Sequence, residues 1–281
     1  MLRFPLVRDL TVNRARWSAL LDLFLRIERN KSLLGEMMRR EVRERTAGQA
    51  LGWIWIVAQP VLTTAAYILV FGVLFRSASD VGGGRQIAFL LAGLLPWVAA
   101  SDLLGRATFA ITGSAGFVKQ IVFPVELLVL RFAGPLAITL GVSLAFYVGY
   151  LMWVGHGPKW MWFALPIAIF GYLCLIVGLG LAIAAVSVFV RDIRDITNLY
   201  LTVGLFFSPI LYDISYVPSA MRWIIFINPI TPVVLAFQDV FFYGAFAHPW
   251  AWVFAGVWGL LSLELGFGLF RLLRPLMSDA L

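Results

Sequence analysis

Long uncharged apolar runs alternate with short charged intervals along this chain of 281 residues. A membrane-spanning helix needs about 20 predominantly apolar residues to cross roughly 30 Å of hydrocarbon. Six runs are candidates, and the last continues through Glu264 to Phe270. They cover residues 51–75, 86–101, 132–155, 160–190, 196–212 and 249–263. The pattern predicts an all-α integral membrane protein with six transmembrane helices within residues 51–270.

One further apolar stretch, residues 213–248, is interrupted by Pro218, Arg222, the pair Asn228-Pro229, Pro232 and Asp239. Proline removes a backbone donor and disfavours helix in the residue before it. The stretch therefore predicts two short helices, 219–227 and 231–243, neither long enough to cross alone. We expect residues 213–245 to form an external re-entrant helical hairpin between spans five and six.

Ahead of the first apolar run, residues 15–46 have the pattern of an amphipathic helix. Leu34, Met38 and Val42 recur every four residues, and basic residues surround them. An apolar stripe with a basic face is typical of a helix in the membrane interface. Packing on the protein's own cytoplasmic face is the alternative. Residues 1–50 are thus expected to be a cytoplasmic segment with an amphipathic interface helix.

The distribution of charge tests this topology, because cytoplasmic loops are enriched in Lys and Arg. With six spans and a cytoplasmic N-terminus, eighteen of the 22 basic residues fall inside and four outside. Counting the hairpin as a seventh span would place Arg271 and Arg274 outside. The charges favour six spans and a cytoplasmic tail at residues 271–281. The net charge of +7 is then a topology signal, and no nucleic-acid partner is expected.

Composition and motifs exclude several functions. The chain is 61% apolar and 13% charged, so no part of it is polar enough to be a separate soluble domain. No GxxxxGK[ST] phosphate loop occurs, and Gly82–Gly84 lacks the lysine of such a loop. His156, His248 and the single Cys174 have no partners at motif spacing. We therefore expect no catalytic residue, no metal site and no cofactor bound by this chain.

Two groups of residues within the apolar runs leave alternatives open. Asp102, Asp239 and Glu264 are the ionisable groups deepest in the runs, and structural roles are favoured over a proton path. Tyr67, Phe71 and Phe75 recur every four residues and must share one helical face. That face is either a packing stripe or a platform for sugar rings, and the residues alone favour packing.

From Arg40 to Pro60 the chain reads REVRERTAGQALGWIWIVAQP, a basic helix, a turn of small residues and the start of an apolar run. This segment resembles the membrane subunits of type 2 ABC exporters, in particular the group that moves lipid-linked O-antigen, capsule or teichoic acid. Later features match that group in order: Lys119 with Phe123-Pro124, Arg191-Asp192, Ser208-Pro209, Val217-Pro218 and Asn228-Pro229. The likeness covers roughly residues 35–275.

The resemblance implies the channel-forming subunit of an ATP-driven exporter in the bacterial inner membrane, with both termini cytoplasmic. It implies a homodimer of this chain with two separate ATPase subunits, which bind ATP and magnesium. The implied substrate is a lipid-linked glycan, which would raise the odds that the aromatic face lines its path.

The resemblance also implies roles for particular residues. Residues 105–124 would hold the cytoplasmic gate and the ATPase coupling segment, and residues 213–245 the external gate. Coupling would involve Phe117, Lys119, Phe123 and Pro124, and the external gate Pro218, Asn228 and Pro229. Headgroup entry would involve Arg40, Arg43 and Arg45, although anchoring to bulk lipid is the favoured explanation for these three. Two rival functions remain: a type 2 ABC exporter of a drug or other lipid, and a channel or carrier that works without ATP.

Overall fold

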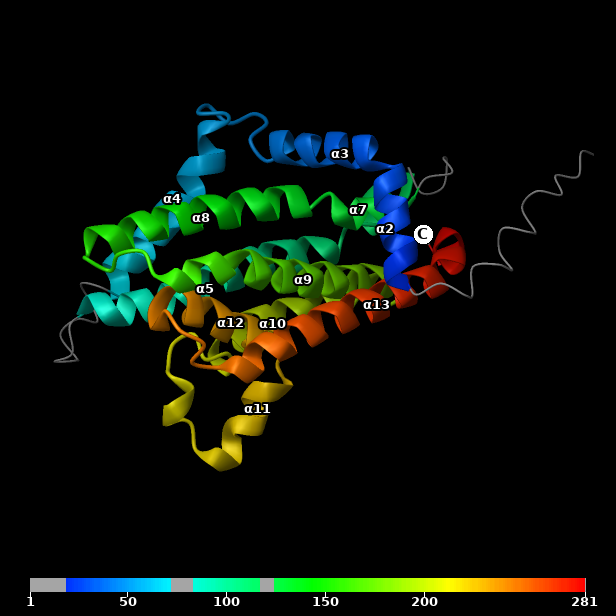
Figure 1. Cartoon of the computed structure of the whole chain (residues 1–281). Helices are drawn as coiled ribbons and strands as arrows, with labels where there is room; N and C mark the ends of the chain where they lie inside the picture. Colours follow the sequence, from blue (N-terminus) through cyan, green and yellow to red (C-terminus); the bar gives the residue numbers. More distant parts are fainter. Residues whose placement is uncertain (1–18, 72–82, 117–123, 281) are drawn as a thin grey trace, which may run out of the picture.

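The computed structural model describes residues 19–71, 83–116 and 124–280, and these ranges form helices and short turns without a strand. In Figure 1 several long helices lie roughly side by side, and shorter helices cover their ends and one edge. The main helices are α2 (Ala19–Arg29), α3 (Lys31–Glu44), α4 (Ile54–Leu69), α5 (Gly83–Ala107), α7 (Leu127–Leu130), α8 (Ala133–Trp153), α9 (Leu165–Ser187), α10 (Ile193–Phe207), α11 (Arg222–Ile227), α12 (Thr231–Gln238) and α13 (Pro249–Ala280).

Four segments among the described residues are long and apolar enough to cross a membrane. They are Arg85–Ala107, Leu127–Trp153, Trp160–Ser187 and Pro249–Met277. A helix also occupies each of the other two predicted runs, but α4 has 16 residues and α10 has 15. At 1.5 Å per residue these helices rise about 24 and 22 Å. The all-α membrane class is confirmed, whereas the count of six spans stays a prediction.

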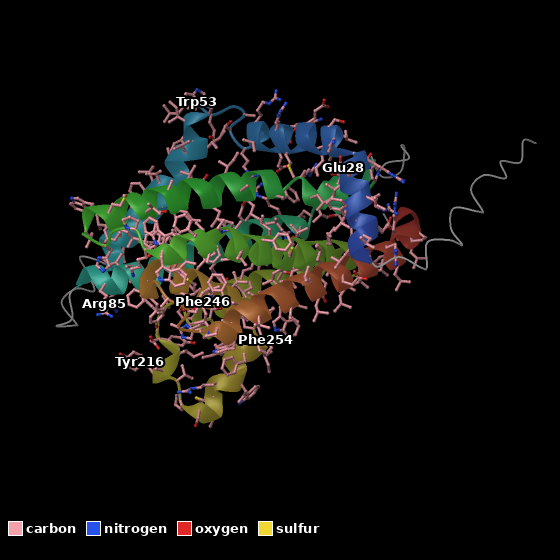
Figure 2. All side chains as sticks on the ribbon, in the orientation of Figure 1. Glu28, Trp53, Arg85, Tyr216, Phe246 and Phe254 are labelled. Atoms are coloured by element: carbon pink, nitrogen blue, oxygen red, sulfur yellow. The ribbon has the colours of Figure 1, made fainter. Side chains whose placement is uncertain are left out.

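The four long segments differ in how much of their surface the protein covers. In Arg85–Ala107, which includes most of α5, 83% of an apolar 18-residue stretch is buried, so this helix lies at the centre of the bundle. In Pro249–Met277 of α13 the corresponding share is only 28%. Phe254 is one of the large apolar side chains that α13 leaves exposed (Figure 2). An outer helix with exposed apolar side chains is expected where lipid or another subunit covers the surface.

The most extensive helix contact joins α9 and α13 through glycines seven residues apart on each helix. Gly171 and Gly178 of α9 face Gly259 and Gly266 of α13. A Cβ atom on Gly259 would lie 2.8 Å from the Gly171 carbonyl oxygen, and one on Gly178 would lie 2.3 Å from the Ser262 backbone. Close approach of backbones at small residues is a common way for helices to associate in membranes. We call this contact the glycine seam.

The N-terminal amphipathic segment differs from its prediction. Instead of one helix over residues 15–46, the described part contains α2 and α3, which break at Asn30 and run in different directions (Figure 1). On α3, Leu34 is buried and Met38 lies against Gly134 at the start of α8. This is the contact expected if the helix packs on the protein itself, and the location in the membrane interface stays a prediction.

The predicted break at Asn228-Pro229 is present. Ser219–Ile227 and Thr231–Tyr243 are separate helical segments bent by 102°. The first comprises a 3-10 turn and α11, and the second comprises α12 and a π-helical turn, η9 (Asp239–Tyr243). The Tyr243 hydroxyl donates a hydrogen bond of 2.6 Å to the Asp213 carboxylate. The end of the bent pair therefore meets Asp213, which precedes the pair in the sequence.

Candidate functional site

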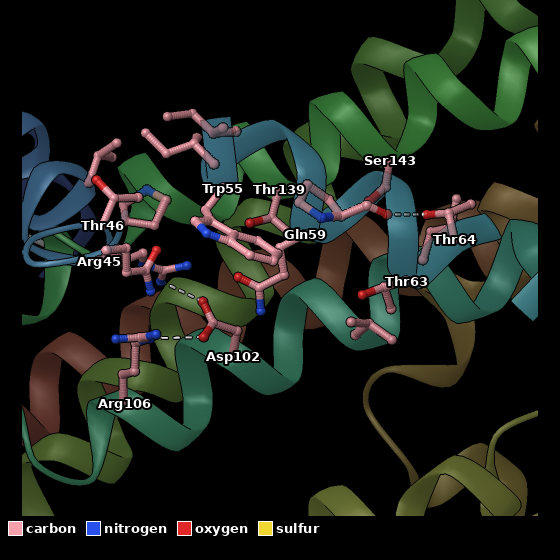
Figure 3. Close-up of a pocket in the computed structure, with 18 of the residues that line it drawn as sticks. Arg45, Thr46, Trp55, Gln59, Thr63, Thr64, Asp102, Arg106, Thr139 and Ser143 are labelled. Carbon is pink, nitrogen blue, oxygen red and sulfur yellow. Dashed lines mark hydrogen bonds and ion pairs between the residues drawn. The ribbon is translucent and has the colours of Figure 1, made fainter. Parts of the chain in front are cut away.

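A cavity of about 440 Å³ lies between α4, α5, α8 and the turn that follows α3 (Figure 3). One end is charged and contains Arg45, Asp102 and Arg106. The remaining wall carries polar and aromatic side chains from α4 and polar side chains from α8: Trp55, Gln59, Thr63, Thr64, Tyr67, Thr139 and Ser143. We refer to this cavity as the α4–α5–α8 pocket.

The charged end is built on one carboxylate. Asp102 accepts from Arg45 Nη2 at 2.5 Å and from Arg106 Nε at 2.8 Å. Arg106 lies four residues after Asp102 on α5, so the helix itself brings these two together. Arg45 comes from the end of α3, far away in the sequence. The structure thus joins the N-terminal segment to the central helix by an ion pair.

Nearby Glu41 lies between this cluster and Arg131. Its carboxylate lies 3.2 Å from Arg131 Nε and 3.8 Å from Arg106 Nη1, and its side chain is buried. Glu41 therefore forms ion pairs with both Arg131, which precedes α8, and Arg106. Three guanidinium groups then face the two carboxylates of Asp102 and Glu41, a net positive charge.

One face of α4 forms the neutral wall. Trp55, Gln59, Thr63 and Tyr67 all line the pocket and lie four residues apart, so they follow one another along a single helical face. Tyr67 is half-buried, and its ring centroid lies 6.5 Å from that of Phe71. Hydroxyl, amide and aromatic groups along one wall suit a sugar, because a sugar offers both hydroxyl groups and an apolar ring face.

The structure brings Arg45 and Tyr67 of the predicted site residues into this one pocket. It does not bring in Arg40 and Arg43, which are exposed on α3; Arg40 forms an ion pair of 2.6 Å with Glu44. Tyr67 and Phe71 both pack against the hydrophobic core, the contact expected of a packing stripe. The remaining path and coupling predictions lie outside the described residues: Phe75, Phe117, Lys119 and Phe123. Pro124 is described, and its carbonyl accepts from the Leu127 N–H at 2.9 Å.

Asn228 of the predicted external gate holds the bent pair in place. Its side chain is almost completely buried, and its amide nitrogen donates to Ser208 Oγ at 2.8 Å. Its side-chain oxygen accepts from the Tyr200 hydroxyl at 2.8 Å and from the Ile230 N–H. Pro218 is the residue before the 3-10 turn that begins the pair, and Pro229 follows Asn228 at the bend. These contacts position the bent pair against α10, and gating itself stays a prediction.

A second buried carboxylate fastens the bent pair to α13. Asp239 is fully buried and accepts from the His248 N–H, from His248 Nδ1 and from Trp252 Nε1, at 2.9–3.0 Å. All three donors come from one short segment, residues 248–252. Asp239 therefore has a structural role, as expected, and His248 is its partner rather than an isolated histidine.

At the opposite end of the bundle, charged groups connect α2 to two distant parts of the chain. Glu264 of α13 accepts the backbone N–H groups of Ala19 and Leu20 at 2.7 and 2.8 Å. Arg26 of α2 lies 2.7 Å from Glu126, which is almost completely buried. Glu264 thus caps a helix, a role the sequence did not suggest, because its partners are backbone groups 244 and 245 residues away.

The described helices and the separation of charged ends from apolar spans define a multi-pass membrane protein. The family model described as "ABC-2 type transporter" matches residues 32–242, most of the chain. The chain belongs to this family. It is therefore the membrane subunit of a transporter and not an enzyme, and the family implies a separate ATP-binding partner subunit.

Several proteins with named roles are similar to this chain over most of their length. An O-antigen export system permease protein RfbA of Klebsiella pneumoniae is 24% identical over 251 residues, which cover 89% of this chain and 95% of that protein. An RfbA of Myxococcus xanthus is 27% identical over 214 residues, 75% and 81% of the two chains. The polysialic acid transport protein KpsM of Escherichia coli is 22% identical over 248 residues, 87% and 94% of the two chains.

Proposed function

We propose that this chain is the channel-forming subunit of an ATP-driven exporter that moves a lipid-linked polysaccharide out of the cytoplasm across the bacterial inner membrane. O-antigen, capsule and teichoic acid are the candidate polymers. Relatives whose names refer to O-antigen or polysialic acid match nearly nine-tenths of this chain. The observation in the structure that carries the proposal is the α4–α5–α8 pocket, in which positive charge meets a polar and aromatic wall.

In the proposed complex two copies of this chain assemble with two ATPase subunits and form the channel between them. Arg40 and Arg43 on the open face of α3 make the first contact with an anionic headgroup, and Arg45 receives it at the pocket. The sugar chain follows the face of α4 from Gln59 to Tyr67 and then Phe71. Residues 105–124 couple the ATPase to the channel.

The proposed topology has six spans, with α4 and α10 as the two short ones and residues 213–245 as an external hairpin. The hydrogen bond between Asp213 and Tyr243 supports the hairpin, because a segment whose ends meet returns to the side where it began. Two basic residues that the charge distribution places on the external side of the membrane contact Phe242 near the end of this hairpin, which supports an external location for the hairpin. Lys159 donates to the Phe242 carbonyl, and Arg85 lies over the Phe242 ring.

Deletion and complementation test this function. Removing the gene from its host should abolish the polysaccharide at the cell surface, and the cloned chain should restore it. Unchanged surface polysaccharide in the deletion strain would refute the proposal, and accumulation of a different lipid or drug would support a rival substrate.

A substitution then tests the path. Tyr67→Ala should leave membrane abundance and ATPase assembly normal but reduce export, since the ring is expected to contact the polymer. Leu62→Ala is the matched control, because Leu62 lies on the same helix with 58% of its surface exposed and does not line the pocket. Export that falls only in step with abundance would assign Tyr67 to packing.

A further inference from the structure

The charged end of the α4–α5–α8 pocket is incompletely satisfied. Asp102 has two carboxylate oxygens, and each serves a different arginine. An arginine and a carboxylate pair most strongly when two parallel hydrogen bonds join them. Here each guanidinium receives one oxygen, so the single carboxylate is divided between two groups that could each use both of its oxygens.

One donor atom in this cluster has no partner. Arg45 Nε is buried and makes no hydrogen bond to any described residue. A buried donor without an acceptor costs about 1–3 kcal/mol. Glu41 cannot supply the acceptor at its present place, because its carboxylate lies against Arg131. The pocket therefore combines a net positive charge, an orphan N–H group and open space beside them.

We propose that Arg45 and Arg106 form a binding site for a phosphate group of the transported substrate, with Asp102 as the counterion that the phosphate displaces. This inference rests on the proposed function. A diphosphate that joins a lipid to a glycan offers two non-bridging oxygens on each of two phosphorus atoms, which suits two guanidinium groups and the additional Nε donor better than the two oxygens of a single carboxylate. The cavity also has room for more than a phosphate, so sugar units attached to it would extend along α4.

Electrostatic repulsion explains why the phosphate should displace Asp102 from the two arginines and not bind beside it. A diphosphate with one negative charge on each phosphate group, beside an ionised Asp102, would place like charges within a few ångströms in a partly buried site, and repulsion there is strong. The two arginines then exchange their internal carboxylate for the phosphate. Arg106 lies at the start of residues 105–124, so this exchange changes the contacts of the segment proposed to couple to the ATPase.

The test is binding of inorganic pyrophosphate to the purified full chain, without its ATPase partner, in nanodiscs of phosphatidylcholine. Arg45→Gln and Arg106→Gln should each weaken binding by about tenfold or more, as expected for loss of a charge-assisted hydrogen bond. Asp102→Asn should tighten binding, because the internal competitor has lost its charge. Lys31→Gln is the matched control and should bind like wild type, since Lys31 is exposed, is paired with Glu28 and does not line the pocket.

Tighter binding by Asp102→Asn would distinguish the proposed site from an effect of misfolding, because misfolding would weaken binding in every variant. Equal affinities in all variants, or weaker binding by Asp102→Asn, would overturn the inference. A second set of nanodiscs containing phosphatidylglycerol distinguishes the source of the phosphate. Pyrophosphate binding that persists there supports a substrate phosphate, whereas its loss by competition assigns the site to a membrane phospholipid and overturns the substrate assignment.

Export measurements separate this inference from the proposed function. If wild type exports polysaccharide and Arg45→Gln and Arg106→Gln do so equally well, the phosphate site is wrong and the function stands. If pyrophosphate binds as expected but the wild-type chain restores no surface polysaccharide, the anion site stands and the proposed function is wrong.

Discussion

Gly266 of α13 lies so close to Gly178 of α9 that a Cβ atom on Gly266 would be 2.0 Å from the Gly178 carbonyl oxygen. Both neighbours at this point are backbone, which cannot rotate aside as a side chain can. The contact therefore requires glycine at Gly266, and the two helices must separate if any larger residue replaces it.

Gly266→Ala should destabilise the protein by about 3 kcal/mol, the upper part of the range for overpacking. The matched control is Gly268→Ala on the same helix, where an added Cβ meets no atom within 4 Å. That control should be neutral or slightly stabilising, because alanine favours helix over glycine by up to about 1 kcal/mol. Thermal unfolding in detergent measures both, and equal melting temperatures for the two variants would contradict the glycine seam.

Glu264→Gln should loosen α2 without unfolding the bundle. The Glu264 carboxylate accepts two N–H groups at the start of α2, and losing its charge should cost about 1–2 kcal/mol. We expect faster hydrogen exchange over residues 19–29 and faster tryptic cleavage after Arg26 and Arg29. Glu44→Gln is the control, because its exposed ion pair with Arg40 contributes little. Unchanged exchange in Glu264→Gln would show that α2 is held by other contacts.

Asp213 gives the stability a dependence on acid pH. Burial acts to raise its pKa, but hydrogen bonds from the Tyr243 hydroxyl and from Ser215 outweigh burial, so the pKa of Asp213 lies below its usual 3.8. The stabilisation is therefore present above about pH 3.8 and is lost as pH falls through the lower folded value. Wild type should melt above Asp213→Asn at pH 7, and the difference should shrink toward pH 3. If the difference in melting temperature between wild type and Asp213→Asn grew as the pH fell, the lowered pKa of Asp213 would be contradicted.

Cysteine labelling tests the six-span topology in a Cys174→Ala background. Single cysteines at Ser219 and Ala245 should react with a membrane-impermeant reagent on intact cells, because both lie in the proposed external hairpin. A cysteine at Ser278 should react only after permeabilisation. Labelling of Ser278 from outside would mean an odd number of spans, and protection of Ala245 would place the end of the hairpin on the other side.

Much of the helical layout could be predicted from the sequence, because hydrophobic run length and proline position are local properties. The break between residues 227 and 231 is where Asn228-Pro229 predicted it. The break at Asn30 was missed, since no proline or glycine marks it and the amphipathic pattern continues across it. Span counting was least secure for α4 and α10, whose described α-helices have 16 and 15 residues.

The candidate site was only partly visible from the sequence. Arg45 and Tyr67 were predicted site residues, yet Asp102 and Arg106 were not placed with them, because the pocket joins segments more than fifty residues apart. One signal was present: Trp55, Gln59 and Thr63 extend backward the same four-residue spacing that identified Tyr67. The partners of Asp239 and Glu264 are backbone and aromatic N–H groups in other segments, which sequence spacing does not reveal.

The hydrogen bonds of Asp239 restrict how the bent pair can move. The bent pair is fastened to α13 through one carboxylate whose three donors lie within residues 248–252. The middle of α13 is joined to α9 along the glycine seam, so this helix cannot easily follow a moving neighbour. Any movement of the bent pair relative to α13 must therefore either keep the three hydrogen bonds of Asp239 or break them.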